Sequence, residues 1–214
     1  MMGVLGHDLR NPLNAVKMMA ASLLRQGLPE AARGKVDVID RAANRMAEMI
    51  ETLLDLTRVR GQGGLPITRT LCDVGAIAKE VASELAAATP DRTLHVDLDG
   101  ELEGQWDPAR VGQAISNLIA NALEHGDPLA PVLVSVAGSD EAVVVKVRNE
   151  GPPIPSELRP VLFEAFSRGD RSPHRLGLGL FIVKQIAAAH GGTIDVESSA
   201  ETGTVFTLVL PRAS

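Results

Sequence analysis

The sequence predicts an α+β protein in two parts: an N-terminal antiparallel helical hairpin, two copies of which make a four-helix bundle, and a C-terminal two-layer α/β sandwich. Apolar residues first recur every three or four positions over residues 5–56, as on one face of a helix. The glycine-rich segment "RGQGGLP" at residues 60–66 interrupts this pattern. Beyond it, strand-like and helical segments are mixed. We therefore expect two domains, at residues 1–60 and 67–214.

The composition excludes several classes of protein. A net charge of −6 and an aromatic content of 2% argue against nucleic-acid binding, which uses basic patches and stacking rings. Cys72 is the single cysteine, so no internal disulfide can form, which suits a reducing cytosol. No apolar run approaches the ~18 residues of a membrane span. We expect a soluble, cytoplasmic piece whose first helix is already under way at its start.

The first part contains two apolar stripes joined by a short connection, which predicts the hairpin. Pro12 should kink the first helix or loosen its first turns, and Gly27 and Pro29 should end it. A lone hairpin cannot cover both apolar faces, whereas a homodimer would; the alternative is that the hairpin packs on its own chain. The stripes are Leu5, Leu9, Leu13, Val16, Met19 and Leu23, then Val36, Ile39, Ala43, Met46, Ile50, Leu53 and Leu56.

The pattern of the second part predicts three helices and a mostly antiparallel sheet. Asp73 is a candidate N-cap for one helix, and Asp107 with Pro108 is a strong start for the next, which Gly126 ends. A third helix follows Gly177. The expected strands lie near residues 66–74, 94–98, 132–138, 141–151, 193–198 and 204–210.

Polar side chains interrupt the apolar helix after Asp107. Asn117 and Asn121 share one face of it, and His125 extends that face by a turn. Because asparagine is a poor helix former, helix stability alone does not explain why two of them occur here. The two amides are either satisfied core residues or ligands that offer oxygens to Mg²⁺ and donors to phosphates.

Two glycine-containing segments follow. Asn149 ends a strand just before Gly151, which allows close backbone approach to a ligand, although an ordinary proline-rich turn has the same pattern. Gly177 and Gly179 open a helix whose free N–H groups could hold a polyphosphate. The polar connection between these segments is long. It predicts either a mobile lid over a ligand or surface disorder.

Taken in order, these segments resemble the sensor histidine kinases of two-component systems over essentially the whole chain. Each match is weak by itself, but six matches in the family's order, with a helical hairpin before an α/β sandwich, are a strong signal. The matching motifs are the H-box "HDLRNP" (7–12), the N-box "NLIANALEH" (117–125), the G1 box "NEGPPIP" (149–155), the F-box "LFEAFSR" (162–168), the G2 box "GLGL" (177–180) and the last glycine motif "GTVF" (203–206).

The resemblance implies a role for each matching residue. His7 corresponds to the phospho-accepting histidine, Asp8 to the acid that assists it, and Asn11 to the residue that orients water when phosphate is removed from the partner. Asn121 corresponds to the Mg²⁺ ligand and Asn117 to a phosphate-side contact. The remaining matches are His125 (nucleotide), Arg168 (γ-phosphate), Gly177 and Gly179 (phosphate loop) and Thr204 (near the adenine).

The family's fold and chemistry are then the expectation for this chain. They comprise a dimerisation and phosphotransfer domain followed by an ATP-binding domain of the GHKL type. The cofactors would be ATP and Mg²⁺. The reaction would be autophosphorylation on histidine and transfer to an aspartate of a response-regulator receiver domain, with phosphatase activity toward that regulator as an addition.

The chain departs from the family pattern at four positions. Asn149 stands where most members have an aspartate that accepts from the adenine amino group, so replacing Asn149 by aspartate should tighten ATP binding. Pro153 and Arg175 replace glycines, and Glu124 replaces a common lysine. This G1 box resembles that of phytochrome-type soluble kinases. The departures also leave open a dimeric scaffold or phosphotransfer module with a degenerate nucleotide site, and, less in keeping with the hairpin, another GHKL ATPase.

Overall fold

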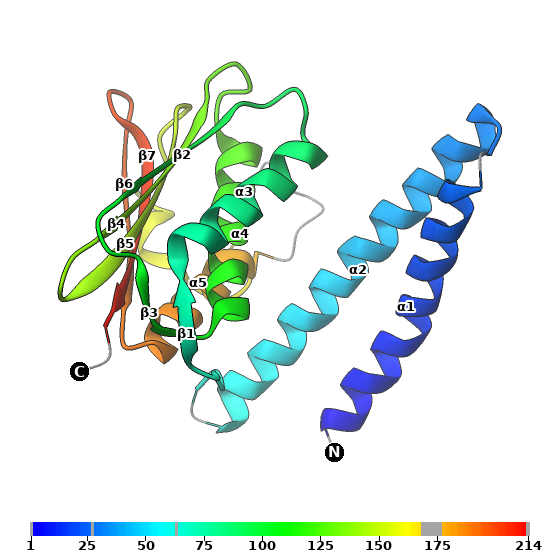
Figure 1. Ribbon diagram of the computed structural model, residues 1–214, viewed down its shortest axis with the longest axis horizontal. Helices are drawn as coiled ribbons and strands as arrows, with labels where there is room; N and C mark the ends of the chain where they lie inside the picture. The colour runs from blue at the N-terminus through cyan, green and yellow to red at the C-terminus, as the bar shows by residue number, and fades with distance from the viewer. Residues whose placement is uncertain (1, 27, 63, 168–176, 213–214) are drawn as a thin grey trace. The chain divides into compact units, whose positions relative to one another are not determined.

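The computed structural model describes residues 2–26, 28–62, 64–167 and 177–212, in two compact units (Figure 1). The first unit is Met1–Gly61 and the second is Gln62–Ser214. The second helix runs to Gln62, so it continues past Arg60 into the glycine-rich segment. Each unit is described by itself below.

The first unit is a hairpin of two long helices, α1 (Met2–Arg25) and α2 (Glu30–Gln62). α1 continues through Pro12, so the proline does not divide the helix. The carbonyl of Pro29 accepts hydrogen bonds from Ala32 and Arg33 and so begins the first turn of α2.

The apolar stripes of the hairpin are only partly covered within one chain. Val36 and Ala43 of the second stripe are buried, whereas Ile39 and Met46 of the same stripe are 50% and 47% exposed. In the first stripe, Met19 is 66% exposed. A hollow of about 370 Å³ lies along the hairpin and is lined by Ala15, Val16, Met19, Ala20, Leu23, Val36 and Ile39.

The second unit contains a five-stranded sheet in the order β2-β4-β5-β7-β6 and a separate pair, β1 with β3. β2 and β4 are parallel and the other neighbours are antiparallel. The sequence predicted every one of these strands except β3. Their bounds are β1 (Thr70–Asp73), β2 (Leu94–Asp99), β3 (Glu103–Trp106), β4 (Val132–Gly138), β5 (Ala142–Asn149), β6 (Thr193–Ser199) and β7 (Gly203–Pro211).

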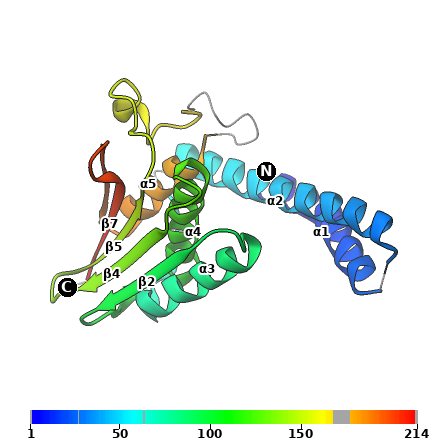
Figure 2. The same cartoon turned by 90° about the horizontal axis from the view of Figure 1, so that it is seen from above.

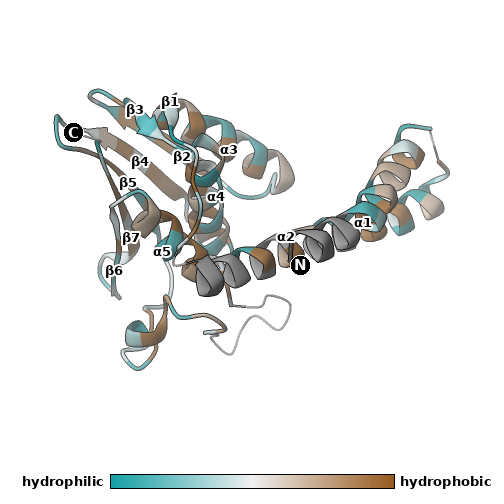
Figure 3. Cartoon of the chain, turned by 90° about the horizontal axis from the view of Figure 1, so that it is seen from below, coloured by the Kyte–Doolittle hydropathy of each residue, from teal (hydrophilic) through white to brown (hydrophobic). Residues whose placement is uncertain are grey.

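Three helices cover one face of this sheet (Figure 2). They are α3 (Val74–Ala88), α4 (Pro108–His125) and α5 (Gly179–Ala189), and a short 3₁₀ turn spans Arg159–Val161. The core between the two layers is mainly aliphatic, as the brown colour along β4 and β5 shows in Figure 3. The largest fully buried side chains of the unit are Trp106, on β3, and Phe206, on β7.

The predicted helix caps are confirmed. A carboxylate oxygen of Asp73 accepts from the backbone N–H groups of Gly75 and Ala76, at 2.7 and 3.1 Å. Asp107 caps α4 by accepting from the N–H of Arg110 at 3.1 Å, with Pro108 in the first turn. α4 therefore begins after Asp107 and ends before Gly126, and these two ends determine where along the helix axis its asparagines lie.

A buried histidine links α5 to the start of α4. His190 is 2% exposed. Its Nε2 lies 3.0 Å from the backbone N–H of Asp107, so it must accept, and its Nδ1, 2.8 Å from the carbonyl of Ile186, must carry the proton. Burial lowers the pKa of His190; the Ile186 carbonyl opposes this, the charge of Arg69 adds to it and that of Asp107 opposes it.

We predict that His190 makes the second unit less stable in mild acid. Because its pKa is lower in the folded than in the unfolded protein, its contribution is fully present above the unfolded value of about 6.5 and is lost as the pH falls below it. One proton accounts for a slope of up to about 1.4 kcal/mol per pH unit. Urea unfolding between pH 7 and pH 5 measures it.

His190→Leu should therefore lower stability at pH 7 and reduce the loss between pH 7 and pH 5. His95→Gln, at an exposed position of β2, is the matched control and should leave the slope unchanged. If the stability of His190→Leu fell with pH as steeply as that of the unaltered protein, His190 would not be the source of the acid sensitivity.

Candidate functional site

Four elements of the second unit bring the predicted nucleotide motifs together. Asn149 at the end of β5 pairs in register with Thr204 at the start of β7. The end of α4 reaches the same place, because a Cβ on Gly126 would lie 3.0 Å from Cβ of Asn149. The start of α5 lies beside the middle of α4, because a Cβ on Gly179 would lie 3.5 Å from the side-chain oxygen of Asn117.

The polar face of α4 lies between the core and solvent. Asn117 and Asn121 are half-buried and His125 is exposed, while Leu118, Ile119 and Ala122 are fully buried. The asparagines are therefore at the margin of the core, where a ligand can reach them. Glu124 is exposed.

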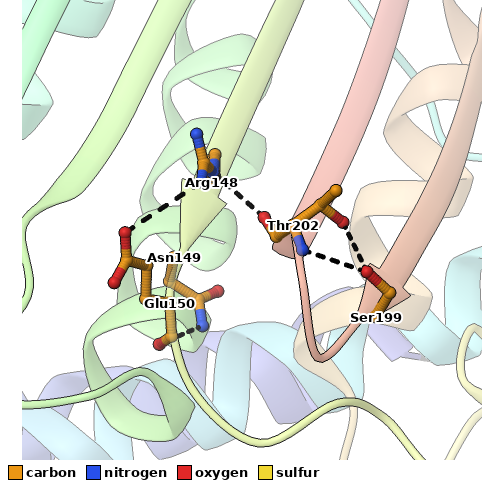
Figure 4. Close-up of polar contacts among 5 residues, drawn as sticks. All are labelled: Arg148, Asn149, Glu150, Ser199 and Thr202. Atoms are coloured by element: carbon orange, nitrogen blue, oxygen red, sulfur yellow. Dashed lines mark hydrogen bonds and ion pairs between the residues drawn. The ribbon is translucent and has the colours of Figure 1, made fainter.

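The amide of Asn149 is oriented by the next residue. Asn149 is 5% exposed, and its Nδ2 donates to the carbonyl oxygen of Glu150 at 3.2 Å (Figure 4). A carbonyl can only accept, so the amide nitrogen must face Glu150 and the side-chain oxygen must face the other way. Asn149 is thus presented as a hydrogen-bond acceptor.

The segment after Asn149 packs tightly on the end of α4. The carbonyl of Glu150 also accepts from the backbone N–H of Asp127, at 2.6 Å. Gly151 has φ +144°, and a Cβ there would lie 3.2 Å from the nitrogen of Asp127 and the oxygen of His125. A side chain at Gly151 would force the two segments apart, which accounts for the glycine.

A hydroxyl pair lies under the same site. Thr204 and Ser198 are both buried, and their hydroxyl oxygens are 2.7 Å apart. Ser198 Oγ also accepts from the N–H of Ile154 at 2.9 Å, and the Ser198 carbonyl accepts from Arg159 at 2.7 Å. Thr204 is therefore connected through Ser198 to Ile154 in the G1 box and to Arg159 in the segment that follows it. Nothing in the sequence singled out Ser198 or Arg159.

The F-box segment is anchored on the sheet by an aromatic contact. The rings of Phe163 and Phe206 meet edge to face, with centroids 6.4 Å apart. Phe166 is 48% exposed and has φ +66°, an unusual backbone conformation for a non-glycine residue. Arg168 and Arg175, and with them the centre of the predicted lid, lie outside the described residues.

The predicted phospho-acceptor group lies on the other unit. His7 and Asp8 are in α1, and Asn11 follows one turn later, where it is exposed. In the second unit, Gly177 has φ +67°, a conformation that favours glycine, two residues before α5 begins.

A cleft of about 640 Å³ lies on a different side of α5. Its lining includes Arg159, the F-box residue Phe163, Lys184, Ile194 and Asp195, but none of the residues to which the resemblance assigns a role in nucleotide binding. It is therefore separate from the site at Asn149. Within the described residues, no group of three or more His, Cys, Asp or Glu side chains could hold a metal ion.

The comparisons with known proteins agree with this arrangement. Residues 106–214 match the family model described as "Histidine kinase-, DNA gyrase B-, and HSP90-like ATPase", and residues 1–62 match the "His Kinase A (phospho-acceptor) domain". The second match separates this chain from other ATPases of the first group.

The chain belongs to the sensor histidine kinase family.

Its curated relatives are bacterial signalling proteins. It is 34% identical to a bacteriophytochrome of Pseudomonas aeruginosa, over 99% of this chain and 29% of the relative. It is 36% identical to the probable sensor histidine kinase TcrY of Mycobacterium tuberculosis, over 96% of this chain and 44% of the relative. This histidine kinase chain thus spans less than half the length of either protein.

Solved structures share the fold. The full-length ShkA structure in complex with AMPPNP superposes with a TM-score of 0.78 at 24% identity, over 100% of this chain and 46% of that one. The mycobacterial sensor histidine kinase MprB has a TM-score of 0.60 at 27% identity, over 69% of this chain and 100% of that one. The predicted α+β fold is confirmed, and the C-terminal part of this kinase is an ATP-binding domain. Among the described helices, none is long and apolar enough to cross a membrane.

We predict that Ser198→Ala destabilises the ATP-binding domain by about 1–3 kcal/mol, because it leaves the N–H of Ile154 and the hydroxyl of Thr204 without a buried partner. Ser199→Ala is the matched control: that hydroxyl bonds Thr202 in an exposed turn (Figure 4) and should contribute less. Urea unfolding of both variants measures the difference. Equal losses would contradict a special role for Ser198.

Proposed function

We propose that this chain is an ATP-dependent histidine kinase that phosphorylates itself on His7 and passes the phosphoryl group to an aspartate of a response-regulator receiver domain. The observation that carries the proposal is the convergence of Asn117, Asn149, Gly179 and Thr204 in one domain of a chain that also carries the H-box helix. The domains would be residues 1–60 for dimerisation and phosphotransfer and residues 67–214 for nucleotide binding.

The adenine would lie against the ends of β5 and β7. The side-chain oxygen of Asn149 faces away from Glu150 and would accept from the adenine amino group. Thr204, paired with Asn149 in the sheet, would lie near the same ring. Gly151 would allow the backbone to approach the base, and His125 would contact the nucleotide.

The phosphates would lie between α4 and the start of α5. Gly177 and Gly179 would leave backbone N–H groups open to the phosphate chain, and Asn117, next to Gly179, would contact it. Mg²⁺ keeps several waters and usually takes one or two protein oxygens together with phosphate oxygens. Asn121, on the same face of α4 as Asn117, fits this requirement, since a cluster of protein carboxylates is not needed.

His7 and Asp8 would perform the transfer. Imidazole is largely neutral near pH 7, so one ring nitrogen of His7 can form the bond to the γ-phosphorus as the bond to the bridging oxygen breaks and ADP leaves. Asp8 would accept the hydrogen bond of the other ring N–H and stabilise the charge that develops. Arg168 would neutralise the γ-phosphoryl oxygens. Asn11 would orient water for dephosphorylation of the regulator.

The hairpin would pair with a second copy. Val16, Met18, Met19, Val38, Ile39 and Met46 are 41–70% exposed in the single chain. An exposed apolar face of this kind marks an interface, and two such hairpins make a four-helix bundle that covers it.

Incubation with radiolabelled ATP tests the proposed activity. We expect His7→Ala to abolish labelling without changing ATP affinity, because His7 is on α1 and the nucleotide residues are on the other domain. The label on the unaltered protein should be lost in acid, as expected for phosphohistidine. His95→Ala, at an exposed position of β2, is the matched control and should label normally. Persistent labelling of His7→Ala would remove His7 from the proposal, and a chain that binds no ATP would favour the degenerate scaffold.

The structure changes the expected effect of Asn149→Asp. In the aspartate, one oxygen would replace the nitrogen that now donates to the Glu150 carbonyl 3.2 Å away, so a hydrogen bond becomes a repulsion between two oxygens. We expect a loss of about 1–3 kcal/mol in stability. The carboxylate can relieve this repulsion only by turning away from the Glu150 carbonyl, which would take its oxygens out of the position that accepts from the adenine amino group, so ATP affinity should not rise.

Isothermal titration with ATP and GTP, together with urea unfolding, measures both effects. Guanine has a carbonyl where adenine has its amino group, so Asn149→Asp should still discriminate more strongly against GTP. ATP binding that tightens with no loss of stability would show that the Glu150 contact does not orient this side chain.

A further inference from the structure

Arg92 lies outside every motif of the family, in the loop between α3 and β2, yet it reaches the end of α4. Its Nη1 donates to the carbonyl of Leu123 at 2.6 Å, and its Nη2 donates to the carbonyl of Asp127 at 3.2 Å. The two carbonyls flank His125 and Gly126. One guanidinium therefore holds both ends of the segment that closes α4.

The position suits a cation and specifically an arginine. The last carbonyls of a helix have no partner within the helix and carry the negative end of its dipole. A planar guanidinium can donate to two acceptors in fixed directions from two different nitrogens. A lysine ammonium has a single nitrogen and cannot span two acceptors in this way. Arg92 Nε is buried without a hydrogen-bond partner among the described residues, so the side chain is held there by the two Nη bonds.

The segment that Arg92 holds is the one on which Asn149 depends. The N–H of Asp127 donates to the Glu150 carbonyl at 2.6 Å, and the same carbonyl orients the amide of Asn149. Gly126 approaches the Asn149 side chain so closely that a Cβ would lie 3.1 Å from its Nδ2. A displacement of residues 123–127 would therefore move or turn the amide of Asn149.

We propose that Arg92 is a positioning residue for nucleotide recognition: by fixing the carbonyls of Leu123 and Asp127 it sets the orientation in which Asn149 reads the adenine. This rests on the proposed nucleotide site. Arg92 itself touches neither base nor phosphate in this proposal. It acts through Asp127 and Glu150.

The test compares Arg92→Lys with Arg212→Lys. Arg212 makes a similar clamp at the opposite end of β5, where its guanidinium donates to the carbonyls of Ser139, Glu101 and Glu103. Both substitutions keep the positive charge and remove a planar guanidinium whose nitrogens donate to backbone carbonyls. Both should lower the melting temperature.

Only Arg92→Lys should change recognition of the base. Titrations with ADP and with inosine diphosphate, which has a carbonyl in place of the amino group, are run with Mg²⁺ at a temperature at which each variant is fully folded. We expect Arg92→Lys to weaken ADP binding roughly three- to thirtyfold, the range for residues that act through others. Inosine diphosphate should lose less, so the preference for ADP falls. Arg212→Lys should keep the unaltered preference.

Three outcomes would overturn the inference: unchanged ADP affinity in Arg92→Lys, equal loss for both nucleotides, or the same loss of preference in Arg212→Lys. If the unaltered protein binds neither nucleotide, both the inference and the proposed function fail. If it binds ADP and only the Arg92 result is negative, the proposed function stands.

Discussion

The carbonyl of Glu150 is the junction on which the candidate site depends. It accepts from the backbone of Asp127 and from the side chain of Asn149, and so joins the end of α4 to the end of β5. A backbone oxygen with two lone pairs can accept from both donors at once. The glycines at 126 and 151 are required because both donors must approach within van der Waals distance of the neighbouring segment.

The same junction explains how asparagine can stand where most of the family has aspartate. A carboxylate needs donors around it, whereas an amide needs an acceptor on its nitrogen side. Here the Glu150 carbonyl is that acceptor. The neutral side chain is thus matched to its surroundings, and in the nucleotide site that we propose its oxygen would still accept from adenine, without the additional strength of a charged acceptor. This argues against reading Asn149 as a sign of a degenerate site.

Anchoring by backbone carbonyls recurs in this domain. Arg92 holds the end of α4, Arg159 holds Ser198 and Ile154, and Arg212 holds the turns at the other end of the sheet. A guanidinium suits this task because its donors diverge in one plane and it stays charged at any physiological pH. Aromatic residues are few, so the core is built from aliphatic side chains and these polar contacts fix the loops that the core does not reach.

The sequence by itself determined every strand but one, the helices and their order. The spacing of apolar residues predicted the hairpin and the Val-rich strands, and the capping residues predicted α4 between Asp107 and Gly126. These signals could be read from the sequence because they are local. β3 was missed because its four residues adjoin a strong helix start and its partner β1 is distant in sequence. Tertiary structure alone decided which half of each hairpin stripe is covered by its own chain, as Ala43 and Met46 show. It alone decided which way the amide of Asn149 faces and that Arg92 closes α4, because both depend on atoms that meet only after the chain has folded.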